Sequence, residues 1–358
     1  MSIAEYTIQS WLFDEAEGRY DIDLAESGVR FQLLSDLRLD PEWDLDYSLD
    51  RGRAALREAI AGIYGAEPPA ADSVAVTHGA QEALYLLYRS LLSPGDHVVA
   101  TSPGWQQAWE VPRAAGCEVT VLPWRPGTPF DTAALAAAVG PRTRAIVINS
   151  PGNPSGCVLG EEEWAAVTEI AAGCGAWLVN DEEYLLDFRD SVVHRTPLGI
   201  SVSSLSKVYG MPALRLGWIH APGAVVEGAV NYKRYTTVSN SAVWERAAEQ
   251  VLAERDRHVE RYRRLVAPGA ELLDTFVARH PDRLRLVRPQ GTPFAWLETA
   301  VRTPSRELAE RLVAEHRTLV MPAEVFGAEH AVRLSFARPA DVLEEGLTRF
   351  DKLLAETD

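Results

Sequence analysis

Short apolar runs alternate with helical patterns between about residues 52 and 221. The runs lack the polar alternation of a half-exposed strand, and the stretches between them repeat apolar residues at helical spacing. Such strands are buried on both faces, so the pattern predicts a mostly parallel sheet covered by helices, an α/β core. The expected strands are Ser73–Thr77, His97–Thr101, Glu118–Leu122, Ala145–Asn149, Trp177–Asn180 and Gly217–His220, and the expected helices are Arg53–Ile63, Ala80–Leu92, Trp105–Ala115 and Glu161–Cys174.

The pattern changes after Pro222, where a long, highly charged helical stretch is expected at about Ala242–His280. The strands and helices that follow come in a looser order, which predicts a smaller α+β domain. We expect an N-terminal segment (1–47) packed on the small domain or over the active site, a large domain (48–240), and a long helix with a small C-terminal domain (241–358). The later elements are expected at Leu284–Val287, Phe294–Leu297, Ser305–Glu315, Leu319–Met321, Val332–Phe336 and Ala340–Leu354.

Composition narrows the class of function. The 358 residues carry a formal net charge of −16, which argues against a surface built for nucleic-acid phosphates. Cys117, Cys157 and Cys174 are too few and too widely spaced for a disulfide framework or a zinc cluster, so we expect no metal. Residues 1–20 lack the pattern of a signal peptide, and no window resembles a membrane span. These features predict a cytoplasmic protein that acts on small molecules.

Unusual residues gather where the strands of the predicted core end, the edge at which open α/β sheets bind ligands. Gly79, Ala80 and Gln81 lie where a strand runs into a helix, and the free N–H groups of a first helical turn attract phosphate. A plain helix start explains the same segment. Trp105 follows the next strand and suits either stacking on a flat ligand or core packing.

Two further segments follow buried strands. Residues 149–156 contain two prolines and two glycines, which predicts a rigid turn that presents the amide of Asn153. The strand Trp177–Asn180 delivers Asp181 to the sheet edge, and Tyr184 comes three residues later. A carboxylate there could hold a protonated ring nitrogen, or simply cap the next helix.

The serine-rich stretch at 201–206 precedes Lys207, and Arg215 follows eight residues later. Ser204, Ser206 and Arg215 could clamp a phosphate beside a nucleophilic lysine, and a solvated loop is the alternative. Arg333 interrupts an apolar strand and needs an anionic partner, either a ligand carboxylate or a structural ion pair.

In this order the segments resemble fold-type I enzymes that depend on pyridoxal 5′-phosphate (PLP), specifically the class I/II aminotransferases, from about Tyr47 to Phe336. The strongest elements are Ser-Leu-Ser-Lys with its arginine, and the Asn-Pro-Ser-Gly turn followed by Asp181 and Tyr184. The resemblance implies a large domain with a mostly parallel sheet flanked by helices, plus a smaller α+β domain. It also implies PLP as cofactor.

The resemblance assigns a role to each residue. Lys207 binds PLP as a Schiff base and then moves the α-proton of the substrate. Asp181 pairs with the ring nitrogen, Asn153 and Tyr184 bond the phenolic oxygen, and Trp105 stands where the family usually stacks Tyr or Phe on the ring. The phosphate is held by the N–H groups of Gly79, Ala80 and Gln81 together with Ser204, Ser206 and Arg215.

Substrate and subunit contacts are implied in the same way. Arg333 stands where the family binds the substrate α-carboxylate, with Asn153 and Gly28 as further expected contacts. Tyr47 is similar to the tyrosine that reaches the phosphate of the neighbouring subunit. That similarity implies a homodimer with shared active sites.

The reaction stays open at this point. Transamination between an amino acid and a 2-oxo acid is one hypothesis; elimination or cyclisation with the amino group retained is the other. Residues 23–29 are loosely similar to the capreomycidine-synthase group, which acts on an arginine-derived substrate, and Asp21, Asp23 and Glu26 suit a guanidinium or solvent equally. A PLP-binding regulator is a third reading, which the acidic charge disfavours.

Overall fold

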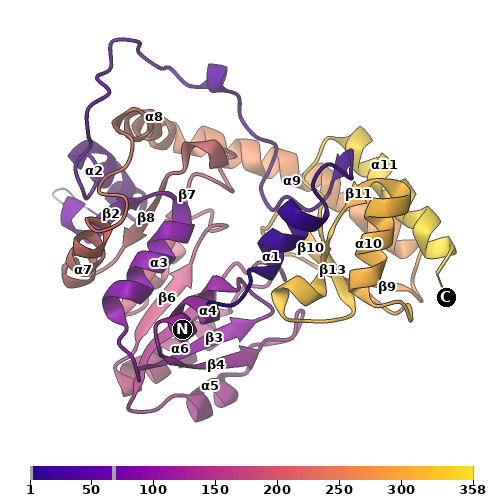
Figure 1. Ribbon diagram of the computed structural model, residues 1–358, viewed down its shortest axis with the longest axis horizontal. Helices are drawn as coiled ribbons and strands as arrows, with labels where there is room; N and C mark the ends of the chain where they lie inside the picture. Colours follow the sequence, from indigo (N-terminus) through magenta and orange to yellow (C-terminus); the bar gives the residue numbers. More distant parts are fainter. Residues whose placement is uncertain (1–2, 67–69, 358) are drawn as a thin grey trace.

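The computed structural model describes residues 3–66 and 70–357. Its centre is a seven-stranded sheet in the order β2-β8-β7-β6-β5-β3-β4 (Figure 1). Strands β3 to β7 run parallel to one another, and β8 is antiparallel to both β2 and β7. The strands are β2 (Val74–Thr77), β3 (His97–Ser102), β4 (Glu118–Pro123), β5 (Thr143–Asn149), β6 (Trp177–Asp181), β7 (Gly199–Ser204) and β8 (Gly217–His220).

Helices cover both faces of this sheet, which explains its continuous apolar strands. Val98 and Val147 pack into a core that also contains residues of α3 (Gly79–Leu91) and α7 (Gly223–Lys233). Val99 and Ile146, their neighbours in the chain, point the other way into a core shared with α6 (Glu161–Cys174). The remaining helices of this part are α2 (Ala54–Ile63), α4 (Gln107–Ala114), α5 (Thr132–Ala138) and α8 (Ala242–Ala253).

A second, antiparallel sheet in the order β12-β13-β10-β9 forms the smaller unit, drawn in orange and yellow in Figure 1. Its strands are β9 (Leu284–Val287), β10 (Phe294–Thr299), β12 (Met321–Pro322) and β13 (Ala331–Ser335), and its helices are α9 (Arg255–Ala278), α10 (Ser305–His316) and α11 (Ala340–Ala355). No helix among the described residues combines the length and the apolar character that a membrane crossing requires.

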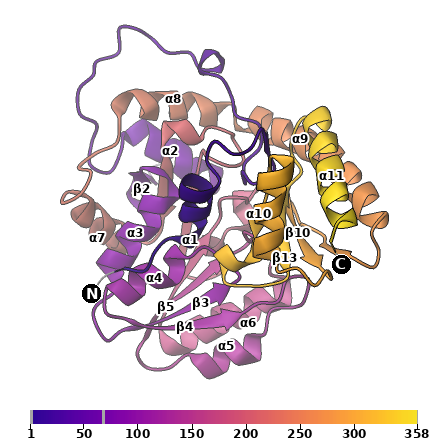
Figure 2. The ribbon, with the colours of Figure 1, turned by 45° about the vertical axis from the view of Figure 1, so that its right-hand side comes forward.

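The N-terminal segment lies between the two units (Figure 2). Thr7, in the short helix α1 (Thr7–Gln9), bonds Gln106 of the large unit and the carbonyl of Val325 in the small one. Further along, β1 (Ile22–Asp23) pairs in parallel with β11 (Thr318–Leu319). Residues 4–28 therefore connect both units.

One expected helix differs from the structure, and strand β7 was not predicted. The helical stretch Ala242–His280 is two helices, because Glu254 leaves helical geometry between α8 and α9 (φ −104°, ψ 24°). Charged residues continue through the break, so periodicity alone did not reveal it. The serine-rich stretch is strand β7 and not a solvated loop: Ser201 is fully buried, with Tyr64 Oη 2.7 Å from its hydroxyl. Partners from other parts of the chain satisfy the hydroxyls that made the segment look exposed.

Gly269 in α9 provides a test of the packing between that helix and the strand that carries Arg333. A Cβ atom at Gly269 would lie 1.9 Å from the carbonyl oxygen of Phe336, so Gly269→Ala should destabilise the fold by about 1–3 kcal/mol in urea unfolding. Gly62→Ala is the matched control, since no atom outside its own helix lies within 4 Å there, and it should be neutral or stabilising. Equal effects of the two substitutions would contradict this packing.

Candidate active site

The carboxyl edge of the main sheet brings most of the predicted site residues to one cavity of about 240 Å³. Strands β5, β6 and β7 end there side by side, at Asn149, Asp181 and Ser204. The predicted residues that line the cavity are Ala80, Gln81, Trp105, Asn153, Asp181, Tyr184, Ser206, Lys207 and Arg215.

One corner of the cavity is built to receive an anion. Gly79 opens α3 with φ +77°, and a Cβ there would lie 2.7 Å from Arg215 Nη2. Gly217 packs against the main chain of Gly79, since a Cβ at Gly217 would lie 2.6 Å from the carbonyl carbon of Gly79. The first N–H groups of α3 have no acceptor within the helix and are joined there by the Arg215 guanidinium. The fully buried hydroxyl of Ser204 accepts the N–H of Ser206 at 2.9 Å and so fixes the adjoining loop.

A second corner holds Asp181 against two asparagines. Asn149 Nδ2 donates to the carbonyl of Asp181 at 2.8 Å, and Asn149 Oδ1 accepts the N–H of Asn153 at 2.6 Å. Burial, followed by the nearby charge of Glu183, raises the pKa of the Asp181 carboxyl above its ordinary value. A cationic group bound next to this carboxyl would therefore stabilise its ionised form.

Trp105 forms a wall of the cavity in a fixed orientation. Its Nε1 donates to Gln81 Oε1 at 2.8 Å, and Tyr6 contacts the indole at right angles with ring centroids 5.7 Å apart. The flat face of the indole is thus held at the edge where Asp181 also lies.

Lys207 follows β7 and is partly exposed in the cavity, with 24% of its side chain accessible. Its Nζ donates to Glu26 Oε1 at 3.1 Å, and the same oxygen accepts the N–H of Gly28 at 2.8 Å. Burial alone would raise the pKa of Glu26, but the charge and hydrogen bond of Lys207 lower it to about 2. Gly28 lies beside Lys207, since a Cβ on it would be 3.8 Å from Lys207 Cδ.

Arg333 is buried next to Asn153, which lines the cavity. Its Nη1 donates to Asn153 Oδ1 at 2.6 Å, and Nη2 donates to the carbonyl of Ala25. Its guanidinium lies 5.1 Å from the ring centres of Phe294 and Phe326, and burial lowers its pKa to about 10. Within the described residues Arg333 has no carboxylate within 4 Å, so the structural ion pair that the sequence left open is absent there.

Tyr184 and Tyr47 have contrasting positions. Tyr184 is buried beside Phe294, and burial raises the pKa of its phenol. Tyr47 is 85% exposed and pairs with Ser241, away from the cavity that contains Lys207. The structure of one chain therefore does not bring Tyr47 to the site.

The sequence analysis did not name four polar residues of the cavity as site residues: Gln9, Ser27, Asn149 and Glu183. Glu183 is only 9% exposed, and its Oε2 has no hydrogen-bond partner among the described residues. Burial raises the pKa of this carboxyl. The available sequence signal was an acidic residue directly after an apolar strand. The sequence analysis assigned that signal to Asp181 and did not consider Glu183.

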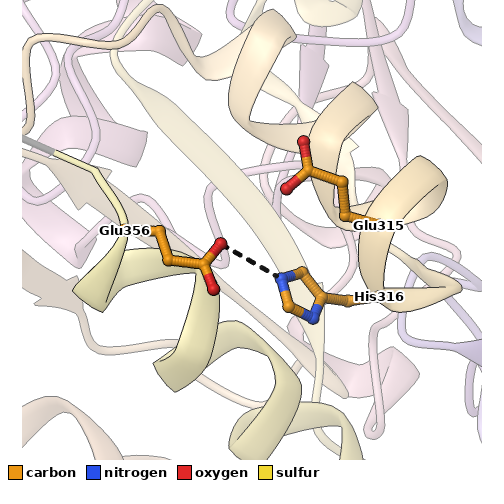
Figure 3. Close-up of side chains that lie close together, drawn as sticks. All are labelled: Glu315, His316 and Glu356. Carbon is orange, nitrogen blue, oxygen red and sulfur yellow. Dashed lines mark ion pairs between the residues drawn. The ribbon is translucent and has the colours of Figure 1, made fainter.

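A separate group of ionisable side chains lies where α10 meets the end of α11 (Figure 3). His316 Nε2 is 3.9 Å from Glu356, and Glu315 receives two hydrogen bonds from Arg311, at 2.9 and 3.1 Å. Arginine supplies the positive charge of this group. This group of side chains joins α10 to α11 and shares no residue with the cavity that contains Lys207.

Comparison with known proteins identifies the family. The model of the family "Aminotransferase class I and II" matches residues 44–350. The chain belongs to this family. Capreomycidine synthase from Streptomyces vinaceus is 31% identical, with 97% of this chain and 93% of that protein covered. Arginine–pyruvate transaminase from Pseudomonas aeruginosa is 32% identical, with 87% and 82% covered.

Solved structures give the same result for the fold. A PLP-dependent aminotransferase from Streptococcus suis superposes with a TM-score of 0.93 at 27% identity, covering 100% of this chain and 99% of its own. The PLP-dependent cyclase OrfR reaches 0.90 at 29% identity, covering 99% and 98%. The predicted family, fold type, PLP cofactor and enzyme class are confirmed.

The residues of the cavity fit PLP. Because Gly79 has no side chain, the Arg215 guanidinium packs directly against the start of α3, and Arg215 lines the cavity together with Ala80 and Gln81, a cationic corner suited to a phosphate. A buried carboxylate, Asp181, is available to a ring nitrogen, and Lys207 is the cavity's amine. The chain has only three lysines; of the other two, Lys233 is fully buried against the carbonyl of Val76, and Lys352 is exposed on α11.

Proposed function

We propose that this protein transfers the amino group of an amino acid to a 2-oxo acid, with PLP held on Lys207. The observation that carries the proposal is that Lys207 and Asp181 line one cavity while Arg333 bonds Asn153 in its wall. An amine, an anion for a ring nitrogen and a guanidinium for a carboxylate are the groups that this reaction needs.

PLP, when bound, supplies the electron sink that makes the α-proton of an amino acid acidic. Arg215, Ser204, Ser206 and the N–H groups at Gly79, Ala80 and Gln81 hold its phosphate. Asp181 would pair with the ring nitrogen, Asn153 and Tyr184 would bond the phenolic oxygen, and Trp105 would lie against the ring. Lys207 lines the same cavity and would supply the amine that attaches the cofactor.

The substrate is oriented by its carboxylate. Arg333 binds the two carboxylate oxygens with its planar guanidinium, which Asn153 holds in place at 2.6 Å, and Gly28 leaves space beside Lys207. Lys207 Nζ would serve as the base that takes up the α-proton of the substrate and gives it back later in the reaction.

We further propose that the enzyme is a cytoplasmic homodimer with shared active sites. Tyr47 would reach the phosphate in the site of the other subunit. Its high exposure supports this role, as does a row of exposed apolar side chains in the same segment, which would gain from burial against a second copy. They are Phe31, Leu33, Leu34, Leu45 and Leu49.

Elimination or cyclisation is the second candidate, and the similarity to capreomycidine synthase and OrfR over nearly the whole chain favours it. The fate of the amino group separates the two. Under transamination, a single amino acid without a 2-oxo acid should convert bound PLP to its amine form and release one equivalent of 2-oxo acid.

Under elimination or cyclisation, the amino group stays on a product and the cofactor keeps its aldehyde oxidation state. Hydroxylated arginine is the informative substrate for that outcome. Mass analysis of the released product and the absorbance of the bound cofactor, recorded together, decide between the two reactions. If none of the amino acids tested, hydroxylated arginine included, converts bound PLP to its amine form, transamination is contradicted.

A further inference from the structure

The structure separates three acidic residues that the sequence could not rank. Asp21 lies at the surface, where its carboxylate pairs with Arg317 and Arg349. Asp23 turns inward on its own segment, where Oδ1 accepts the N–H groups of Ala25 and Glu26. Of the three, Glu26 is the acid whose carboxylate reaches the site, 3.1 Å from Lys207 Nζ.

Glu26 is held firmly in that position. Arg338 donates to the carbonyls of Asp23, Glu26 and Gly28, at 3.0, 2.6 and 3.0 Å. Arg333 donates to the carbonyl of Ala25 in the same segment. Two arginines therefore fix the short segment 23–28 across the site through its main chain, and this fixes the direction from which the Glu26 carboxylate enters.

The charges of the site leave Glu26 without a lasting partner once the cofactor is in place. Arg215 faces the phosphate corner and Arg333 the α-carboxylate position, while Lys207 must bond the cofactor through the same Nζ that now contacts Glu26. Lys207 makes the largest contributions that lower the pKa of Glu26, with smaller ones from the Gly28 N–H and the charge of Arg333. When Lys207 leaves, this mostly buried carboxylate loses its ion-pair partner, so a second cation in the same place would stabilise it.

We propose that Glu26 is a specificity residue that binds a cationic group, guanidinium or ammonium, in the side chain of the amino-acid substrate. The cation of the substrate takes the place of Lys207 on the Glu26 carboxylate. This inference rests on the proposed function and adds the substrate class: basic amino acids and their derivatives. Because Glu26 lies so near Lys207, the cationic group of the substrate must come close to the reacting carbon. The side chain of the substrate is therefore either short or, if long, folded back.

The test compares each basic amino acid with its neutral isostere: arginine with citrulline, and lysine with norleucine. Borohydride treatment of the PLP-loaded enzyme fixes the cofactor on Lys207, and calorimetry then measures binding without turnover. The wild-type protein should prefer arginine over citrulline. Glu26→Gln should reduce that preference by about tenfold or more, the scale of one charge-assisted hydrogen bond, and the ratio of kcat/KM should fall in parallel.

Asp21→Asn is the matched control, because it removes an acid two residues before Asp23 that pairs at the surface and not in the cavity; it should leave both ratios unchanged. Equal losses for arginine and citrulline in Glu26→Gln would overturn the proposal. Equal affinity of the wild-type enzyme for citrulline and arginine would also overturn it, and this measurement does not depend on the folding of any variant. If borohydride fixed no cofactor to Lys207, the proposed function itself would fall, and the Glu26 assignment with it.

Discussion

Lys207→Ala should lower turnover of every amino-acid substrate by on the order of 10⁴-fold, because it removes the amine that attaches the cofactor and moves the α-proton. The effect should appear in kcat more than in KM, since Arg333 and the phosphate corner remain in place. The visible absorbance of the attached cofactor should be lost in the same variant. PLP should still bind weakly through Arg215 and the first turn of α3.

The three lysines of the chain make the attachment site directly measurable. After borohydride reduction, the cofactor mass should appear on the peptide that contains Lys207 and on neither of the others. Lys352→Ala is the control, because that side chain is exposed on α11 and lies outside the cavity. Attachment of the cofactor to Lys233 or Lys352, or full activity in Lys207→Ala, would contradict the assigned role.

Much of the fold was predictable because its signals are local. The apolar runs of β3, β5 and β6 and the amphipathic pattern of α6 depend on neighbours within each element, so their bounds agree closely with those expected. Strand β7 was missed because its serines look solvated in sequence, whereas hydroxyl partners such as Tyr64 and the main chain of Glu182 lie elsewhere in the chain. Tertiary contacts overrode the local polarity.

The site divides along the same line. Asp181 and Asn153 were predictable because strand ends and rigid turns present side chains at the sheet edge whatever the rest of the chain does. The ion pair between Glu26 and Lys207 spans 181 positions, and Arg333 meets Asn153 across 180. No spacing rule connects residues so far apart. The sequence could name the acids near residue 26 but not choose among them.

Asp181→Asn should lower turnover by about 10²–10³-fold while leaving the cofactor attached to Lys207, because it removes only the charge that we propose to pair with the ring nitrogen. Attachment and turnover thus separate in this variant, unlike in Lys207→Ala. Asp181→Glu, which keeps the charge, should recover part of the lost kcat. Loss of both attachment and turnover would instead indicate a collapsed site.

The same carboxyl group should appear in the stability of the protein freed of cofactor. Burial raises the folded-state pKa of Asp181 above its unfolded value near 4, so the unfolded chain releases this proton at a lower pH than the folded one. Stability should therefore fall as the pH rises from about 4 toward 8. Asp181→Asn should flatten that slope in urea unfolding, and Glu183, shifted in the same direction, should account for part of the remainder.

Bound PLP should reduce the slope in the wild-type protein, because a protonated ring nitrogen beside Asp181 would stabilise the ionised carboxylate and lower its pKa. A slope that neither PLP nor the substitution changes would mean that Asp181 does not face the cofactor.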